Sequence, residues 1–206
     1  MPGPITHLQA AYYYNVTHDR RFGSGIYLGS IIPDSVNVNG HAPKEKRWPA
    51  HLRDRDLDIW TANAKRFYNQ NKGKVEEGCL RGYILHILTD IVWDRSFDRP
   101  LYECLLRDGV PERELKRERW NEIYGYEQTQ LESPWFRNEV LLQLSAAEPL
   151  PIGTLDLREI KLWQAQIVSL NLPKGRTPKF VNEPLTDRFF KEVTASADRI
   201  FGEMGC

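Results

Sequence analysis

The sequence has few cysteines that could cross-link a small extracellular domain, and it lacks long apolar segments that could hold the chain in a membrane. It contains three cysteines in 206 residues, at positions 79, 104 and 206, and none of them forms a Cys-x-x-Cys pair. Neither a disulfide framework nor a cysteine zinc site is therefore expected. No apolar run approaches the roughly 20 residues of a membrane span, and the first residues lack the pattern of a signal peptide. We expect a cytoplasmic protein with no transmembrane segment.

The chain also lacks an excess of charge of either sign. Lys and Arg together number 28, as do Asp and Glu, so the formal net charge is zero. Because no basic surplus is present, we predict no nucleic-acid partner. Basic residues do gather between Lys44 and Arg55. Such a segment is most often a solvated loop face, and less often a rim that attracts phosphate.

Glycine-rich nucleotide loops and alternating strand patterns are absent, and helical patterning dominates. Thr6 and Gln9 predict a capping box at the first helix, and residues 35–50 are predicted to form a long loop. We predict a single all-α domain over residues 1–206, with a metal-site half at about 5–95 and further helices over 96–206. Apolar spacings of three and four predict helices over about 7–14, 19–28, 54–70, 75–93, 97–108, 111–131, 134–146, 156–170 and 186–203.

Histidine is scarce, and its placement is the most informative feature of the sequence. Residues 82–93 are apolar nearly all round, which is typical of a buried helix, yet His86 and Asp90 lie four apart on one face of it. A buried carboxylate must be paired, protonated or bound to a cation. No lysine or arginine occurs between Arg81 and Arg95. We predict that His86 and Asp90 bind a divalent metal; a hydrogen bond between them inside the core is the alternative.

Four short segments follow one another in order along residues 5–95. They are Thr6-His7-Leu8, Gly29 to Asp34, His51-Leu52-Arg53-Asp54, and Gly82 to Asp90. This ordered set resembles zinc-dependent phospholipase C-like proteins, and in particular the small bacterial members described as phospholipase C/D-domain proteins. The resemblance implies a helical bundle of that type around a buried HxxxD helix. It also implies bound zinc and hydrolysis of a phosphodiester such as a phospholipid head group.

The resemblance also implies a role for each matching residue. His7 would ligate a second zinc ion, with Asp90 bridging the two ions. Asp34 would act as a ligand, as general base to the attacking water, or as both. His41 lies closer to Asp34 in the sequence and is the alternative to His51. The first zinc site would be formed by Asp34, His51, His86 and Asp90.

The number of ions and the role of the site stay open at this stage. No histidine follows His86, so a third zinc site is not expected and we predict one or two ions. Carboxylate and imidazole ligands suit zinc, with iron and manganese as alternatives. A second hypothesis follows from the missing third site. The protein would then be a catalytically silent metal-binding or interaction module on the same scaffold.

The second half of the chain says less about function. Arg113, Lys116 and Arg119 alternate with glutamates, which predicts an exposed face with local ion pairs. Glu127 is predicted to be solvated on the same grounds. Trp120 and Tyr124 are predicted to pack between helices, with a place in the wall of a cleft as the alternative. The sequence carries no signature of an oligomeric state.

Overall fold

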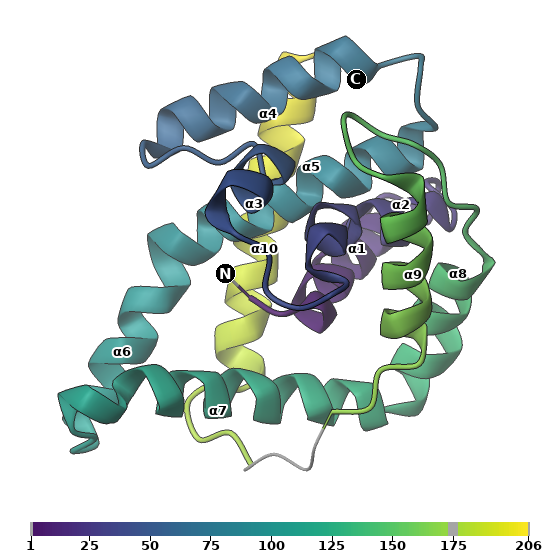
Figure 1. Ribbon diagram of the computed structural model, residues 1–206. Coiled ribbons are helices and arrows are strands. Elements are labelled where there is room, and N and C mark those ends of the chain that lie inside the picture. The colour runs from purple at the N-terminus through teal and green to yellow at the C-terminus, as the bar shows by residue number, and fades with distance from the viewer. Residues whose placement is uncertain (1, 173–176, 206) are drawn as a thin grey trace.

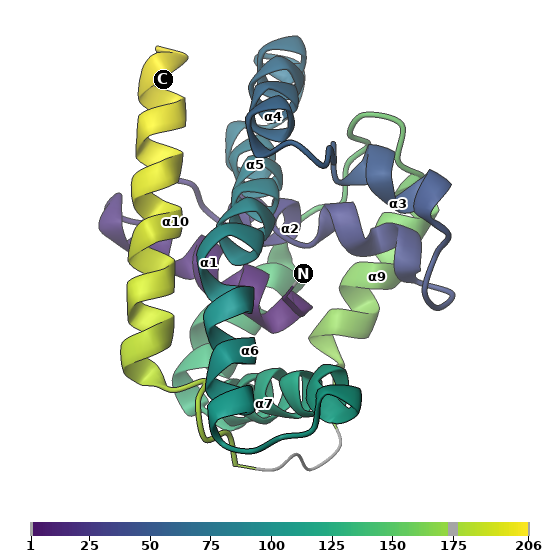
Figure 2. The ribbon, with the colours of Figure 1, turned by 90° about the vertical axis from the view of Figure 1, so that its left-hand side faces the viewer.

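The computed structural model describes residues 2–172 and 177–205, and within these ranges the chain is helical and has no strand. At its centre lies α5 (Glu77–Val92), in which every residue after Glu77 is buried. The all-α class and the buried central helix were therefore predicted correctly. Figures 1 and 2 show four helices around α5, namely α1 (Pro4–Thr17), α2 (Gly25–Gly29), α4 (Leu57–Asn71) and α10 (Glu183–Glu203).

The remaining helices form one end and one side of the bundle. The chain leaves α5 through a π-helical turn, η2 (Trp93–Phe97), and continues directly into α6 (Asp98–Arg107). Helix α7 (Glu112–Glu132) then crosses the end of the molecule below α1 (Figure 1). The predicted helix over 134–146 contains a π-helical segment. The last elements on this side are η3 (Phe136–Leu141), α8 (Leu142–Ala146) and α9 (Leu157–Val168).

The segment 35–50 is not the long loop that was predicted. It begins within a 3-10 helix, η1 (Ile32–Asn37), and ends with α3 (Lys44–Ala50). Two prolines lie at the starts of these elements and do not interrupt them: Pro33 is in the first turn of η1, and Pro43 is the N-cap of α3. Proline is tolerated at both positions because the backbone N–H that it lacks would be unpaired there.

The predicted capping box at α1 is also wrong. The helix begins at Pro4, and its N-cap residue is Gly3, which has no side chain that could accept a hydrogen bond from the helix. Thr6 instead donates from its backbone N and its Oγ1 to the Glu127 carboxylate of α7, at 3.0 and 2.7 Å. The unpaired N–H groups at the start of a helix thus find their acceptor in another helix, and this contact fixes α1 against α7.

Helices α2 and α5 approach each other backbone to backbone. A Cβ atom at Gly82 would lie 2.2 Å from the Ile26 carbonyl oxygen, and one at Gly29 would lie 2.0 Å from the Cys79 carbonyl oxygen. Only glycine permits this spacing, so these two residues set the distance between the helices. The contact brings Ser30, directly after α2, against α5.

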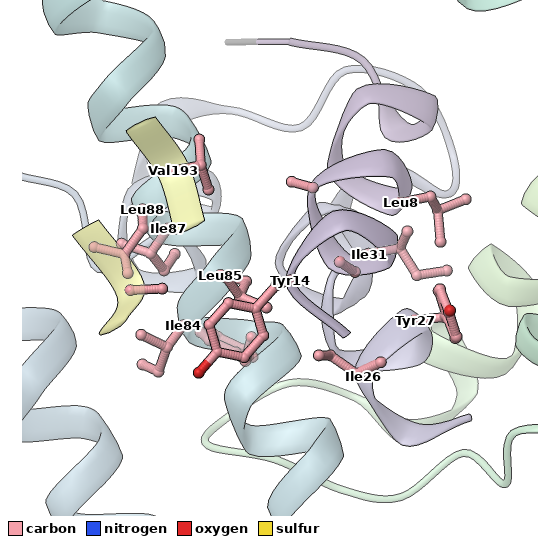
Figure 3. Close-up of a cluster of buried hydrophobic side chains, with 14 of the residues drawn as sticks. Leu8, Tyr14, Ile26, Tyr27, Ile31, Ile84, Leu85, Ile87, Leu88 and Val193 are labelled. Atoms are coloured by element: carbon pink, nitrogen blue, oxygen red, sulfur yellow. The ribbon is translucent and has the colours of Figure 1, made fainter. Parts of the chain in front are cut away.

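Apolar side chains fill the space around the α2–α5 contact. Figure 3 labels side chains from α1, α2, α5 and α10 that form this part of the core, and they are at most 2% exposed. Burial of such side chains contributes roughly 1.5–3 kcal/mol each. The central core thereby holds α1 and α5 in fixed register. Its labelled members include Leu8, Tyr14, Ile26, Ile84, Leu88 and Val193.

Two of the three cysteines lie among the described residues, and both are free thiols. Cys79 is buried in α5 as a small hydrophobic side chain, and Cys104 is also a free thiol. Cys206 lies outside the described residues. Within the described ranges, no helix is both long enough and apolar enough to cross a membrane.

Candidate metal centre

Five predicted site residues meet in one buried cluster, which we call the His/Asp cluster. Asp34 is 9% exposed and the other four are at most 1% exposed. They come from four separate segments of the first half of the chain. The members are His7 of α1, Asp34 of η1, His51 at the C-terminal cap of α3, and His86 and Asp90 of α5.

The structure brings the ligand atoms of the cluster together in two overlapping sets. Within each set, one atom from every residue lies within 4.8 Å of the others. His41, the predicted alternative to His51, belongs to neither set and is exposed at the surface. The first set is His7, Asp34 and His86, and the second is His51, His86 and Asp90.

His86 is oriented by the backbone of the α2 segment. Its Nδ1 lies 2.8 Å from the Ser30 carbonyl oxygen. A carbonyl can only accept, so Nδ1 carries the proton and Nε2 keeps a lone pair. Nε2 is buried without a hydrogen-bond partner among the described residues. Ring N–H contacts of this kind orient metal-binding histidines in proteins, and His86 is therefore set up as a ligand through Nε2.

His51 and Asp34 form the second oriented pair. His51 Nδ1 donates to the Arg47 carbonyl at 2.8 Å, and its Nε2 lies 3.2 Å from Asp34 Oδ1. Two ligands bound at about 2.0–2.1 Å to a tetrahedral zinc ion would lie roughly 3.3 Å apart. The separation therefore suits two ligands of one ion. In the absence of metal it suits a charged hydrogen bond equally well.

The protonation of this pair follows from burial and from the hydrogen bond. Burial by itself would raise the pKa of Asp34, but the hydrogen bond and charge of His51 hold that pKa below its usual value. Burial likewise acts to lower the pKa of His51, but Asp34 outweighs it and raises that pKa. Without metal, the hydrogen bond thus favours the charged form of each partner, an imidazolium and a carboxylate.

Asp90 has no partner to compensate its burial. It is fully buried, and neither carboxylate oxygen has a hydrogen-bond partner among the described residues. Its nearest cluster neighbours are His7 Nε2 at 3.7 Å and His86 Nε2 at 3.9 Å, both beyond hydrogen-bond distance. Burial raises the pKa of Asp90 to about 7. A divalent cation would supply the charge that this carboxylate lacks.

His7 and His86 complete the cluster as neutral rings. Their planes stack with centroids 3.7 Å apart. Burial, followed in each case by the charge of a neighbouring histidine, lowers the pKa of both well below the usual value. A neutral imidazole is the form that binds metal, so both rings are in the ligand form.

The cluster fits a divalent ion by its donors, its spacing and its unpaired buried atoms. Three imidazoles and two carboxylates are the ligand types that zinc prefers. Both sets depend on the single free nitrogen of His86, which can bind only one ion. The geometry therefore centres on one ion, whereas a second would depend on His7 and Asp90. The sequence resemblance assigned His7 and Asp34 to different zinc ions. In the structure, one ligand atom of each lies within 4.8 Å of the other.

The cluster opens onto a cavity of about 740 Å³. Asp34 and His51 form part of its wall, and the rest comes mainly from α3, α6, α7 and α9. Trp120 and Tyr124 line this cavity, in agreement with the cleft alternative. Arg119 was predicted to be exposed, but it is buried and also lines the cavity. The cluster thus has an approach from solvent.

Sequence reasoning missed two groups that support the cluster. The Ser30 carbonyl orients His86, and no sequence signal identifies a backbone acceptor of this kind. Glu127 was predicted to be solvated, but it is 1% exposed, and burial raises its pKa to about 7. A signal for Glu127 was available, because Ile123, Glu127 and Leu131 are spaced by four and share the buried face of α7.

No family model matches the chain, and no match was found among curated proteins or solved structures. Fold and site together define a helical protein with a buried His/Asp cluster at the foot of an open cavity. Its function has to be argued from that site.

Proposed function

We propose that this protein is a metal-dependent phosphoric ester hydrolase that binds one or two divalent ions, zinc in the first place, and cleaves a phosphodiester. The main support is the position of Asp34 and His51, which belong both to the buried cluster and to the cavity wall. Structural zinc sites are closed by protein ligands, whereas catalytic sites keep a position for water or substrate. A cluster that borders an open cavity favours the catalytic kind.

Each residue of the cluster has a role in this proposal. His7, His51, His86 and Asp90 hold the metal, and Asp34 is a ligand or the general base. A bound zinc ion supplies a Lewis acid that polarises a phosphoryl oxygen and acidifies water. Asp34 faces the cavity with a lowered pKa, so it is ionised at neutral pH and able to accept a proton from the attacking water.

The proposed kinship is with zinc-dependent phospholipase C-like proteins. It is supported by the helical fold and by the convergence of the residues carried by the four ordered sequence segments. We also propose a cytoplasmic location, because the cysteine-poor sequence suits a reducing compartment.

One observation favours a second candidate, a catalytically silent metal-binding module. The cluster offers five side chains, and four are enough to saturate a tetrahedral zinc ion. An ion held by four protein ligands would leave no position for a substrate. The two candidates differ in turnover and agree on metal binding.

The test combines metal analysis with turnover of bis-p-nitrophenyl phosphate. We expect one or two zinc ions per purified chain. His86→Ala should lose most of the metal and about a hundredfold or more in rate, because removal of a catalytic metal ligand removes the Lewis acid. His18→Ala is the matched control, since His18 pairs with Asp198 outside the cluster. Unchanged metal content in His86→Ala would overturn the site. Metal without turnover would favour the silent module.

A further inference from the structure

We propose that the phosphodiester cleaved in this cavity carries a nucleoside, so that the substrate is a small nucleotide ester and not a lipid. This inference rests on the proposed function and concerns the same site. It is drawn from the composition of the cavity wall, which the metal chemistry does not use. The wall combines flat aromatic side chains with cations and has almost no aliphatic surface.

The aromatic part of the wall comes from four different helices. Among the residues that the structure describes, no leucine, isoleucine, valine, methionine or phenylalanine lines the cavity, and prolines are its only aliphatic side chains. Acyl chains need a continuous aliphatic groove, whereas nucleobases stack on aromatic rings through their π faces. This wall therefore suits a base better than a lipid tail. Its members are Trp48 of α3, Tyr102 of α6, Trp120 and Tyr124 of α7, and Trp163 of α9.

Trp120 and Tyr124 form a stacking surface on α7. Their rings lie 5.2 Å apart and are nearly parallel, and Tyr124 is 45% exposed. The Arg119 guanidinium lies 4.8 Å from the centroid of the Trp120 ring and holds it in place. Trp163 of α9 adds a further aromatic ring to the wall, and its own indole N–H is buried without a hydrogen-bond partner among the described residues.

The cations of the wall suit the phosphate. Arg53 is paired with Asp94 at 2.5 Å, and Arg119 is paired with Asp98. Arg47 and Lys116 also line the cavity, and neither makes an ion pair with a described residue. These two cations are therefore free to attract the negative charge of a diester.

The size of the cavity limits the substrate. Its volume of about 740 Å³ lies within the usual range of small-molecule sites, roughly 300–1,000 Å³. A mononucleotide ester or a dinucleotide fits such a space, and a duplex does not. The phosphate would lie beside Asp34 and His51, with the base on the Trp120–Tyr124 surface.

Three esters with a common leaving group test this inference on the zinc-loaded protein. They are the p-nitrophenyl diesters of thymidine monophosphate, of methyl phosphate and of phosphocholine. Their leaving group is identical, so differences in kcat/KM report the other substituent. We expect the thymidine ester to exceed both others by about tenfold or more, the size of one base–aromatic stacking contact. A phosphocholine ester that equals or exceeds the thymidine ester would overturn the inference.

Substitution of the stacking surface links that preference to the cavity. Trp120→Leu should reduce the ratio of thymidine to methyl ester kcat/KM about tenfold. Trp135→Leu is the matched control, since Trp135 packs on Tyr12 outside the cavity and the ratio should not change. An unchanged ratio in Trp120→Leu would overturn the role of this surface.

A binding measurement separates this inference from the proposed function. Titration of thymidine monophosphate into the zinc-loaded protein, followed by calorimetry, needs no turnover. Binding that Trp120→Leu weakens about tenfold would support the nucleoside site even if no ester were cleaved, in which case the proposed catalysis alone would fail. Cleavage of the methyl ester with no thymidine preference and no binding would leave the proposed function standing and overturn the inference.

Discussion

Asp90 shows how far the environment of one side chain can indicate an absent partner. A carboxylate without hydrogen-bond donors in a protein core is costly in its charged form, and the two nearest histidines, His7 and His86, are themselves neutral. Either the carboxyl keeps a proton near neutral pH or a cation compensates its charge. Replacement of Asp90 by asparagine should therefore change the free energy of unfolding in opposite directions in these two states.

We therefore predict that, without metal, the Asp90→Asn variant gains stability relative to wild type as pH rises. The unfolded pKa of Asp90 is near 3.8, and burial raises the folded pKa to about 7. Between these values the folded state keeps a proton that the unfolded chain releases, so the Asp90 contribution to stability falls as pH rises, by an amount on the order of 4 kcal/mol. Asparagine does not titrate, so the variant should gain on wild type across this window.

Urea unfolding in EDTA at about pH 5 and about pH 8 measures the difference. With zinc present the order should reverse, because only the wild type keeps the full ligand set. A variant that is equally destabilised at both pH values in EDTA would contradict this account of Asp90.

Part of the site could be predicted at the residue level. The i, i+4 spacing of His86 and Asp90 in an apolar helix is a local pattern, and a buried carboxylate without a nearby cation is visible in the sequence. The Ser30 carbonyl and the Glu127–Thr6 contact depend on tertiary structure, so local patterns could not reveal them. The choice between His41 and His51 depended on the path of residues 38–50, which the sequence did not define.

The packing of helix α2 against helix α5 likewise depends on tertiary structure and could not be predicted from local sequence patterns. Apolar spacing predicted most helices, because burial of one face imposes a period on the sequence. Apolar spacing did not predict the distances between the helices. The space beside Gly82 is filled by the backbone of α2, and no local pattern in the sequence indicates this neighbour.

Gly82→Ala should separate these two helices and weaken the metal site. The added Cβ would lie 2.2 Å from the Ile26 carbonyl oxygen, a backbone atom that cannot move alone. We expect a loss of about 3 kcal/mol in unfolding free energy and weaker zinc binding, because Ser30 would shift away from His86. Gly202→Ala is the control. A Cβ there meets nothing within 4 Å in α10, so a gain of about 0.5–1 kcal/mol is expected.

Thermal unfolding and zinc titration of both variants measure these effects. If Gly82→Ala bound zinc as the wild type does, the orientation of His86 by Ser30 would not depend on the glycine contact. If Gly82→Ala were as stable as Gly202→Ala, the close approach at Gly82 would not set the distance between α2 and α5.

For the whole molecule, the cluster ties together segments that are distant in the sequence. Its side chains come from α1, η1, α3 and α5, and none comes from a residue after Asp90. A ligand that binds only the folded state stabilises the segments that form its site. Metal should therefore rigidify the first half of the chain more than the second.

Hydrogen exchange with and without zinc tests this expectation. Amides of α1, η1 and α3 should exchange more slowly by about tenfold or more when zinc is present, whereas α8, which carries no ligand, should change little. EDTA should restore the faster exchange. Uniform protection of all helices would indicate that the metal stabilises only the global fold, and protection confined to exposed acidic loops would indicate binding elsewhere.

The contact between Thr6 and Glu127 has a consequence for how the protein is made. The histidine next to Thr6 leaves the ribosome long before α7 and α10, two of the helices that pack against α1. All five ligands exist in the nascent chain once α5 has emerged, yet α1 lacks its contacts with α7 and α10 until those helices follow. We infer that the centre reaches its native geometry only after α7 and α10 have been made, well after its last ligand, Asp90.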